Sequence, residues 1–153
     1  MIDRIKAWLA EGKGESSGDR DELQLAVAAL LMEAAQIDGH LDERERVAVR
    51  RVLARRFDLP PDAANQLAAA AERQAEHATQ RFGFTRLINE RYDREGRIAL
   101  LEMLWEVAYA DGVLDPLEDT MLRQVAGLVD VSDHERGAAR LRVRQRLGLD
   151  EQG

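Results

Sequence analysis

The stretch EAAQIDGHLDERE, residues 33–45, returns as EVAYADGVLDPLE at residues 106–118. The offset is constant, since 106 − 33 and 118 − 45 both give 73. Four of the repeated residues are carboxylates, and in each copy they surround an Asp-Gly pair. These acids are Glu33, Asp38, Asp42 and Glu45 in the first copy and Glu106, Asp111, Asp115 and Glu118 in the second. The repetition predicts that one helix–turn–helix unit is used twice.

The residues around each acidic turn predict the same order of elements. Apolar residues fill positions 23–32 and 98–107 almost without interruption, which is typical of a helix buried on most sides. Further helices are expected at about 42–57, 61–79, 86–91 and 133–147, and another is expected to begin at Pro116. Gly83 is expected to break the chain in the connector 74–93. From Leu59 and Val131 onward, the offset between corresponding residues of the two copies is one residue shorter (131 − 59 = 72).

We therefore predict a single all-α domain of seven or eight helices with an internal pseudo-two-fold repeat. The helical domain is expected to span 21–146, with repeat halves at 21–73 and 94–146. Residues 2–11 predict a short amphipathic helix that docks on the core, and residues 12–20 a flexible linker, so 1–20 form an N-terminal extension. The tail 147–153 is expected to fray.

Composition excludes several classes of protein. The chain has 153 residues, no cysteine and a net charge of −7. The absence of cysteine rules out disulfides and thiolate metal sites. An acidic chain is a poor candidate for nucleic-acid binding. No apolar run is long enough to span a bilayer and residues 1–11 do not resemble a signal peptide, so a cytoplasmic location is expected.

A purely structural role explains half of the acidic motif. Asp42 is a good helix N-cap, and Glu45 follows at capping-box spacing. Glu33 and Asp38 lie in or just after the last turn of a helix, where the helix dipole disfavours negative charge. Their equivalents, Glu106 and Asp111, repeat this, so an arginine, a backbone donor or a cation should offset the cost in both copies.

A bound cation is the alternative explanation. In an EF-hand loop, glycine stands at position 6 and a bidentate glutamate at position 12. With Gly39 at position 6, Asp38, Asp42 and Glu45 fall at positions 5, 9 and 12. Positions 1 and 3 hold none of the aspartate or asparagine residues of an EF-hand in either copy, which excludes a standard EF-hand. A looser oxygen site for Ca²⁺ or Mg²⁺, completed by water, stays open beside the structural reading, and its candidate ligands are all eight repeated acids.

The doubled A-x-x-D-G-x-L-D-x-x-E pattern on an all-helical chain resembles the TerB-type tellurite-resistance family. It stands here at 35–45 and 108–118, within a match to most of 21–146. The resemblance implies a cytoplasmic bacterial module linked to tellurite and other stress responses. It also implies membrane-associated and cation-binding partners rather than catalysis. The family's acidic positions map onto Asp38, Asp42, Glu45, Asp111, Asp115 and Glu118, with Glu33 and Glu106 beside them.

Two functional hypotheses follow, neither of which is an enzyme, and a carboxylate-dependent metalloenzyme is a distant third. Serine and histidine residues form no catalytic pattern, so no catalytic residue is assigned. The first hypothesis is a TerB-like module whose acidic turns bind a divalent cation or a cationic partner surface. The alternative is a protein-interaction scaffold whose acidic turns are only helix caps. Its partner would dock on the N-terminal helix and on arginine rows such as Arg136/Arg140/Arg144. Without such a partner, we interpret these arginine rows as solvent-exposed helix faces. The oligomeric state stays open.

Overall fold

A computed structural model describes residues 17–36, 41–76, 81–110 and 116–149. These residues form seven helices, so the all-α prediction is confirmed. The first half contains α2 (Ser17–Ala35), α3 (Glu43–Arg56) and α4 (Pro61–Glu76), and α5 (Arg81–Arg91) connects it to the second half. The second half contains α6 (Arg94–Ala108), α7 (Pro116–Leu128) and α8 (Asp133–Arg146).

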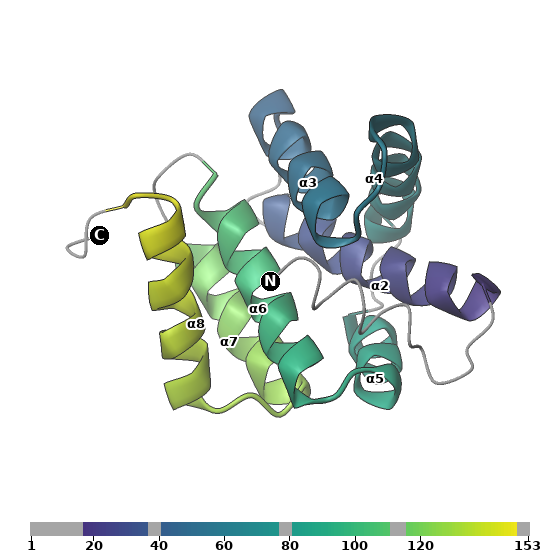
Figure 1. Cartoon of the computed structure of the whole chain (residues 1–153). Helices are drawn as coiled ribbons and strands as arrows, with labels where there is room; N and C mark the ends of the chain where they lie inside the picture. The colour runs from purple at the N-terminus through teal and green to yellow at the C-terminus, as the bar shows by residue number, and fades with distance from the viewer. Residues whose placement is uncertain (1–16, 37–40, 77–80, 111–115, 150–153) are drawn as a thin grey trace.

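Helix α2 lies at the centre of the fold and packs against α3, α4, α5, α6 and α7. Figure 1 shows α6, α7 and α8 side by side on one flank and α3 and α4 on the other. The predicted burial of α2 is confirmed, since every residue from Ala26 to Met32 is at most 3% exposed. Helix α6 is buried in the same way from Leu100 to Ala108. Each of these two helices contributes more buried apolar residues than any other described helix, because neither has a continuous polar face.

Helix α3 and helix α7 end with the same C-terminal capping conformation. Asp58 and Asp130 both adopt a left-handed conformation, with φ of 53° and 59°. The next amide donates back across the turn, from Leu59 to the Ala54 carbonyl at 2.9 Å and from Val131 to the Ala126 carbonyl at 2.8 Å. This is the Schellman pattern. The positions correspond with an offset of 72 (130 − 58), as the sequence alignment of the two halves expects. The pseudo-two-fold axis itself stays a prediction.

Two predicted boundaries are wrong. Helix α2 begins at Ser17, so the last four residues of the predicted linker 12–20 are helical. Acidic residues at 19, 21 and 22 favour the positive end of a helix, which outweighs the single glycine at 18. Helix α5 begins at Arg81 and passes through Gly83 without a break. A glycine inside a helix costs about 1 kcal/mol relative to alanine, and burial of Phe84 and Ile88 on this helix offsets that cost. The predicted helix 2–11 lies outside the described residues.

Candidate functional site

The described part of the first acidic turn is a capping box at the start of α3. The Asp42 carboxylate accepts a hydrogen bond from the Glu45 amide at 2.8 Å. In return, the Glu45 carboxylate accepts one from the Asp42 amide at 3.1 Å. The structural role predicted for this pair is therefore confirmed. Glu33 lies half-buried in the last turn of α2, and Asp38 lies outside the described residues.

The second acidic turn contributes two buried glutamates to the described structure. Glu118, in the first turn of α7, is 8% exposed, and Glu106, near the end of α6, is 5% exposed. Asp111 and Asp115 lie outside the described residues. The two copies therefore differ in burial, since Glu45, the equivalent of Glu118, is half-exposed.

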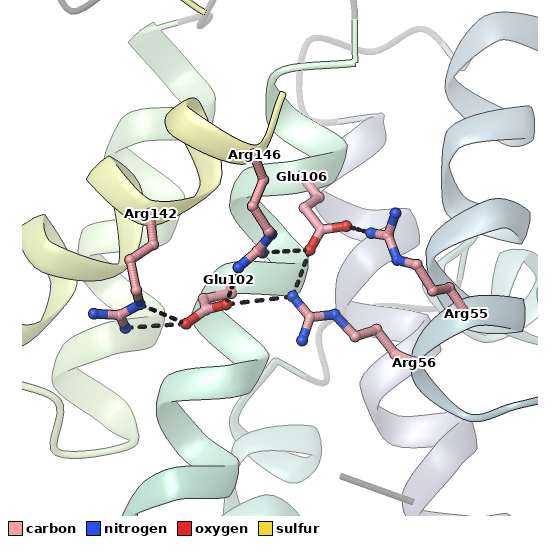
Figure 2. A network of polar contacts seen from close by, with 6 residues as sticks. All are labelled: Arg55, Arg56, Glu102, Glu106, Arg142 and Arg146. Atoms are coloured by element: carbon pink, nitrogen blue, oxygen red, sulfur yellow. Dashed lines mark hydrogen bonds and ion pairs between the residues drawn. The ribbon is translucent and has the colours of Figure 1, made fainter. Parts of the chain in front are cut away.

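Glu106 is surrounded by arginines from two other helices (Figure 2). Arg56 of α3 approaches one oxygen of Glu106 at 2.5 Å, and Arg146 of α8 donates to the same oxygen at 2.8 Å. Arg55 of α3 forms an ion pair with the other oxygen. Of the three explanations that the sequence left open for a glutamate at this helix end, the arginine is the one observed.

A second buried carboxylate extends this arrangement. Glu102 lies one helical turn before Glu106 and is 6% exposed. One of its oxygens accepts hydrogen bonds from Arg146 at 2.8 Å and Arg56 at 3.3 Å. The other accepts from Arg142 at 3.0 Å. We call these six residues the buried ion network, composed of Arg55, Arg56, Glu102, Glu106, Arg142 and Arg146 (Figure 2).

The buried ion network contains more positive than negative charge, because four guanidinium groups face two carboxylates. Burial lowers the pKa of Arg56, and Arg146 lowers this pKa further, whereas Glu102 raises it. Burial would raise the pKa of Glu102, but hydrogen bonds from Arg146 and Arg142 hold this pKa below its ordinary value. Within the described residues, the Arg56 Nε atom is buried without a hydrogen-bond partner.

The sequence did not reveal this network. Neither Arg56 nor Glu102 was singled out from the sequence, yet Arg56 is 3% exposed and Glu102 is 6% exposed. The sequence contained one sign of a buried charge, because Glu102 interrupts the apolar run at positions 100–105. This signal does not reveal the partners of Glu102, because Arg56 and Arg146 lie more than 40 residues away from it along the chain.

A second arginine cluster packs on aromatic rings at the end of α6. The rings of Trp105 and Tyr109 are stacked, with centroids 5.8 Å apart. Arg140 lies over the Trp105 ring at 5.4 Å, and Arg144 lies over the Tyr109 ring at 5.4 Å. The Arg140 Nε atom donates to the Tyr109 hydroxyl at 2.6 Å. Since Arg144 is only 5% exposed, the predicted solvated row on α8 is wrong at this residue.

An open groove of about 540 Å³ lies between α3, the end of α6 and the end of α8. We call it the α3–α6 groove. Its lining residues are Glu43, Arg44, Val47, Ala48, Arg51, Val52, Arg55, Glu106, Tyr109, Ala110, Leu147 and Leu149. Glu43 and Arg44 lie within the first acidic stretch, and Glu106, Tyr109 and Ala110 lie within the second. Described residues of both stretches therefore border the same groove.

Among the described residues, no three acidic or histidine side chains come together as a metal site would require. Asp38, Asp111 and Asp115 lie outside these residues. None of the helices described here is long and apolar enough to cross a membrane.

Comparison with known proteins identifies the family. The family model described as tellurite resistance protein TerB matches residues 24–141, which is most of the chain. No curated protein and no solved structure matches significantly. The family match covers both acidic turns, the buried α2 and α6, and most of α8. The chain therefore belongs to the TerB family.

Proposed function

We propose that this chain is a non-enzymatic module, associated with tellurite or other stress responses, whose acidic turns bind a divalent cation. The observation that carries the proposal is the recurrence of four carboxylates around an Asp-Gly pair, twice, in a TerB-family chain. Helix capping explains Asp42 and Glu45 but does not explain Asp38 and Asp111, which follow helix ends where negative charge is disfavoured.

The structure narrows the set of candidate ligands. Both oxygens of Glu106 interact with arginines, so we assign this residue a structural role and leave it out of the cation site. The cap uses one oxygen of Asp42, whose side chain is exposed, and a carboxylate has a second oxygen available for a cation. The proposed ligands are Glu33, Asp38, Asp42 and Glu45 in the first turn and Asp111, Asp115 and Glu118 in the second.

Described residues of both acidic stretches, Glu43 in the first and Glu106 in the second, line the α3–α6 groove. A cationic surface of a partner protein is the other ligand that the repeated carboxylates would suit. Hard cations such as Ca²⁺ and Mg²⁺ suit these ligands, since every candidate donor is a carboxylate oxygen.

Thermal unfolding of chelator-stripped protein tests the proposal. Ca²⁺, Mg²⁺, Mn²⁺ and Zn²⁺ are added singly to the parent chain and to the double variant Asp38→Asn/Asp111→Asn. An ion at about 100 times its Kd adds ~2.7 kcal/mol to the free energy of unfolding, which raises the Tm by roughly 5–10 °C at this size. We expect the shift in the parent chain and its loss in the double variant.

A matched control separates ligand loss from general charge loss. Asp62→Asn/Asp130→Asn removes two carboxylates outside the acidic turns and should keep the cation-dependent shift. The absence of a shift with every ion, or an equal shift in both double variants, contradicts cation binding at the turns. Either result would favour the alternative in which the turns only cap helices and the function lies in partner docking.

A further inference from the structure

The arginines of α3 fall into two groups with different surroundings. Arg46 forms an ion pair with Glu72 of α4 at 3.0 Å, and Arg50 forms one with Glu43 at 2.9 Å. Arg44 and Arg51 form no ion pair within the described part of the chain, and both are exposed. The sequence shows one uniform arginine-rich helix, whereas the structure shows a neutralised side and a side with unbalanced positive charge.

The unbalanced side of α3 faces the α3–α6 groove. Arg44, Arg51 and Arg55 are spaced by seven and four residues, so they lie within about 40° of one another around the helix. All three line the groove. Arg55 is already bound to Glu106, yet 42% of its side chain remains exposed. Burial lowers the pKa of Arg55, and the nearby Arg146 and Arg51 lower it further, as expected where cations crowd together.

Apart from Glu43 and Glu106, the rest of the groove is mainly apolar. Val47 and Val52 of α3 and Tyr109 of α6 line it from the two sides. Leu147 and Leu149 line it from the end of α8. Leu147 is 43% exposed and is one of three exposed large apolar side chains among the described residues. A volume of about 540 Å³ lies within the range of about 300–1,000 Å³ that is usual for binding pockets.

The charge of this region is opposite to that of the whole molecule. The groove and the buried ion network below it together contain six arginines, Arg44, Arg51, Arg55, Arg56, Arg142 and Arg146. They contain three glutamates, Glu43, Glu102 and Glu106. The chain as a whole has a net charge of −7. A local positive excess on an acidic protein attracts anionic groups while the remaining surface repels them.

We propose that the α3–α6 groove binds an extended segment of a partner protein in which acidic and apolar side chains alternate. Arg44 and Arg51 lie about 10 Å apart along the helix axis, and Arg51 and Arg55 about 6 Å. Alternate side chains of an extended peptide lie about 7 Å apart on one face, a spacing that long arginine side chains can match. The other face of such a peptide would cover Leu147 and Leu149.

The same features favour a peptide over an anionic membrane. A bilayer would bring its negative surface close to many carboxylates of this acidic chain, which costs electrostatic energy. A single peptide reaches the groove without approaching the rest of the surface. The described residues that line the groove include Glu43, Arg44 and Glu106 of the acidic stretches but none of the proposed cation ligands, so this proposal does not depend on cation binding.

Fluorescence anisotropy with a dye-labelled octapeptide of alternating glutamate and leucine tests the proposal. The measurement uses the full chain in the presence of chelator, so its outcome is separate from that of the cation experiment. We expect saturable binding that weakens by about tenfold in Arg51→Glu and in Arg44→Glu, because each variant places a like charge opposite the peptide. Leu147→Ser should weaken binding by about fivefold through loss of apolar contact.

The matched control is Arg86→Glu on α5, which changes the net charge equally at an exposed position away from the groove. It should keep the parent affinity within about twofold. Equal weakening in Arg86→Glu and Arg51→Glu, equal binding of a lysine–leucine octapeptide, or no binding at millimolar peptide would overturn the proposal. Stronger Arg51-dependent binding to phosphatidylglycerol vesicles than to the peptide would assign the groove to a membrane instead. Unfolding curves confirm that each variant is folded.

Discussion

Glu102 and Glu106 show how a buried carboxylate is tolerated in this protein. Two glutamates one turn apart on α6 would repel each other in an apolar interior. Arg56 and Arg146 each contact both of them, so the like charges are separated by shared cations. Removing one partner from such a group leaves uncompensated buried charge, which costs more than the pair contributes when intact.

Glu102→Gln should therefore lower the free energy of unfolding by about 3 kcal/mol at neutral pH. The variant leaves four arginines around a single carboxylate. Urea unfolding measures the effect through the midpoint and the slope. Glu90→Gln, at an exposed position on α5, is the control and should change the free energy by less than about 0.5 kcal/mol. A loss below about 1 kcal/mol for Glu102→Gln would mean that the network is solvated in solution.

The same variant gives a pH signature. The pKa of Glu102 in the folded protein lies below its ordinary value of 4.5, so its stabilisation is complete above that value. As the pH falls through the lowered pKa, the folded protein takes up a proton and this stabilisation is lost. The difference between the parent chain and Glu102→Gln should therefore narrow as the pH falls below about 4.5. A difference that is constant with pH would contradict an ionised Glu102 in the fold.

At the scale of the helices, the ends are built from local signals. Capping boxes begin α3 at Asp42 and α8 at Ser132. Left-handed residues end α3 at Asp58, α7 at Asp130 and α8 at Gly148. Each of these signals involves residues within a few positions of one another, which is why the boundaries of α3 and α8 and the start of α7 were predictable from the sequence.

Two substitutions of Asp42 separate its role as a cap from its proposed role as a ligand. Asp42→Ala should lower the free energy of unfolding by about 1 kcal/mol without added ions, because the Glu45 amide loses its acceptor. Asp42→Asn keeps an N-cap oxygen and should be close to neutral under the same conditions. Adding Ca²⁺ should then stabilise Asp42→Asn less than the parent chain. Equal stabilisation of both would restrict Asp42 to capping. Differential scanning calorimetry measures both effects.

At the scale of the whole molecule, the buried ion network connects the two halves of the sequence. Arg55 and Arg56 come from α3 in the first half, and the four other members come from α6 and α8 in the second (Figure 2). Helix α2 also packs against α6 and α7, so the apolar core is shared as well. Buried apolar residues of the two halves form one continuous cluster.

The two halves should therefore unfold together in a single transition. Trp105, which is 1% exposed in α6, reports on the second half by fluorescence once Trp8→Phe removes the other tryptophan. Far-UV circular dichroism reports on all helices. We expect the two urea midpoints to coincide within error, as two-state unfolding requires. A fluorescence transition displaced from the dichroism transition would show that the halves are independent.

The sequence by itself determined the helical class, the central burial of α2 and α6 and the cap at Asp42. These features depend on helical periodicity and on contacts a few residues apart, both of which are visible in one chain. Only the tertiary structure decided which arginines are neutralised, buried or left unbalanced. Arg46, Arg51 and Arg56 look alike in sequence, yet one pairs with α4, one faces the α3–α6 groove and one enters the core. Their surroundings differ because the charge that neutralises an arginine can lie 46 residues away along the chain, as between Arg56 and Glu102.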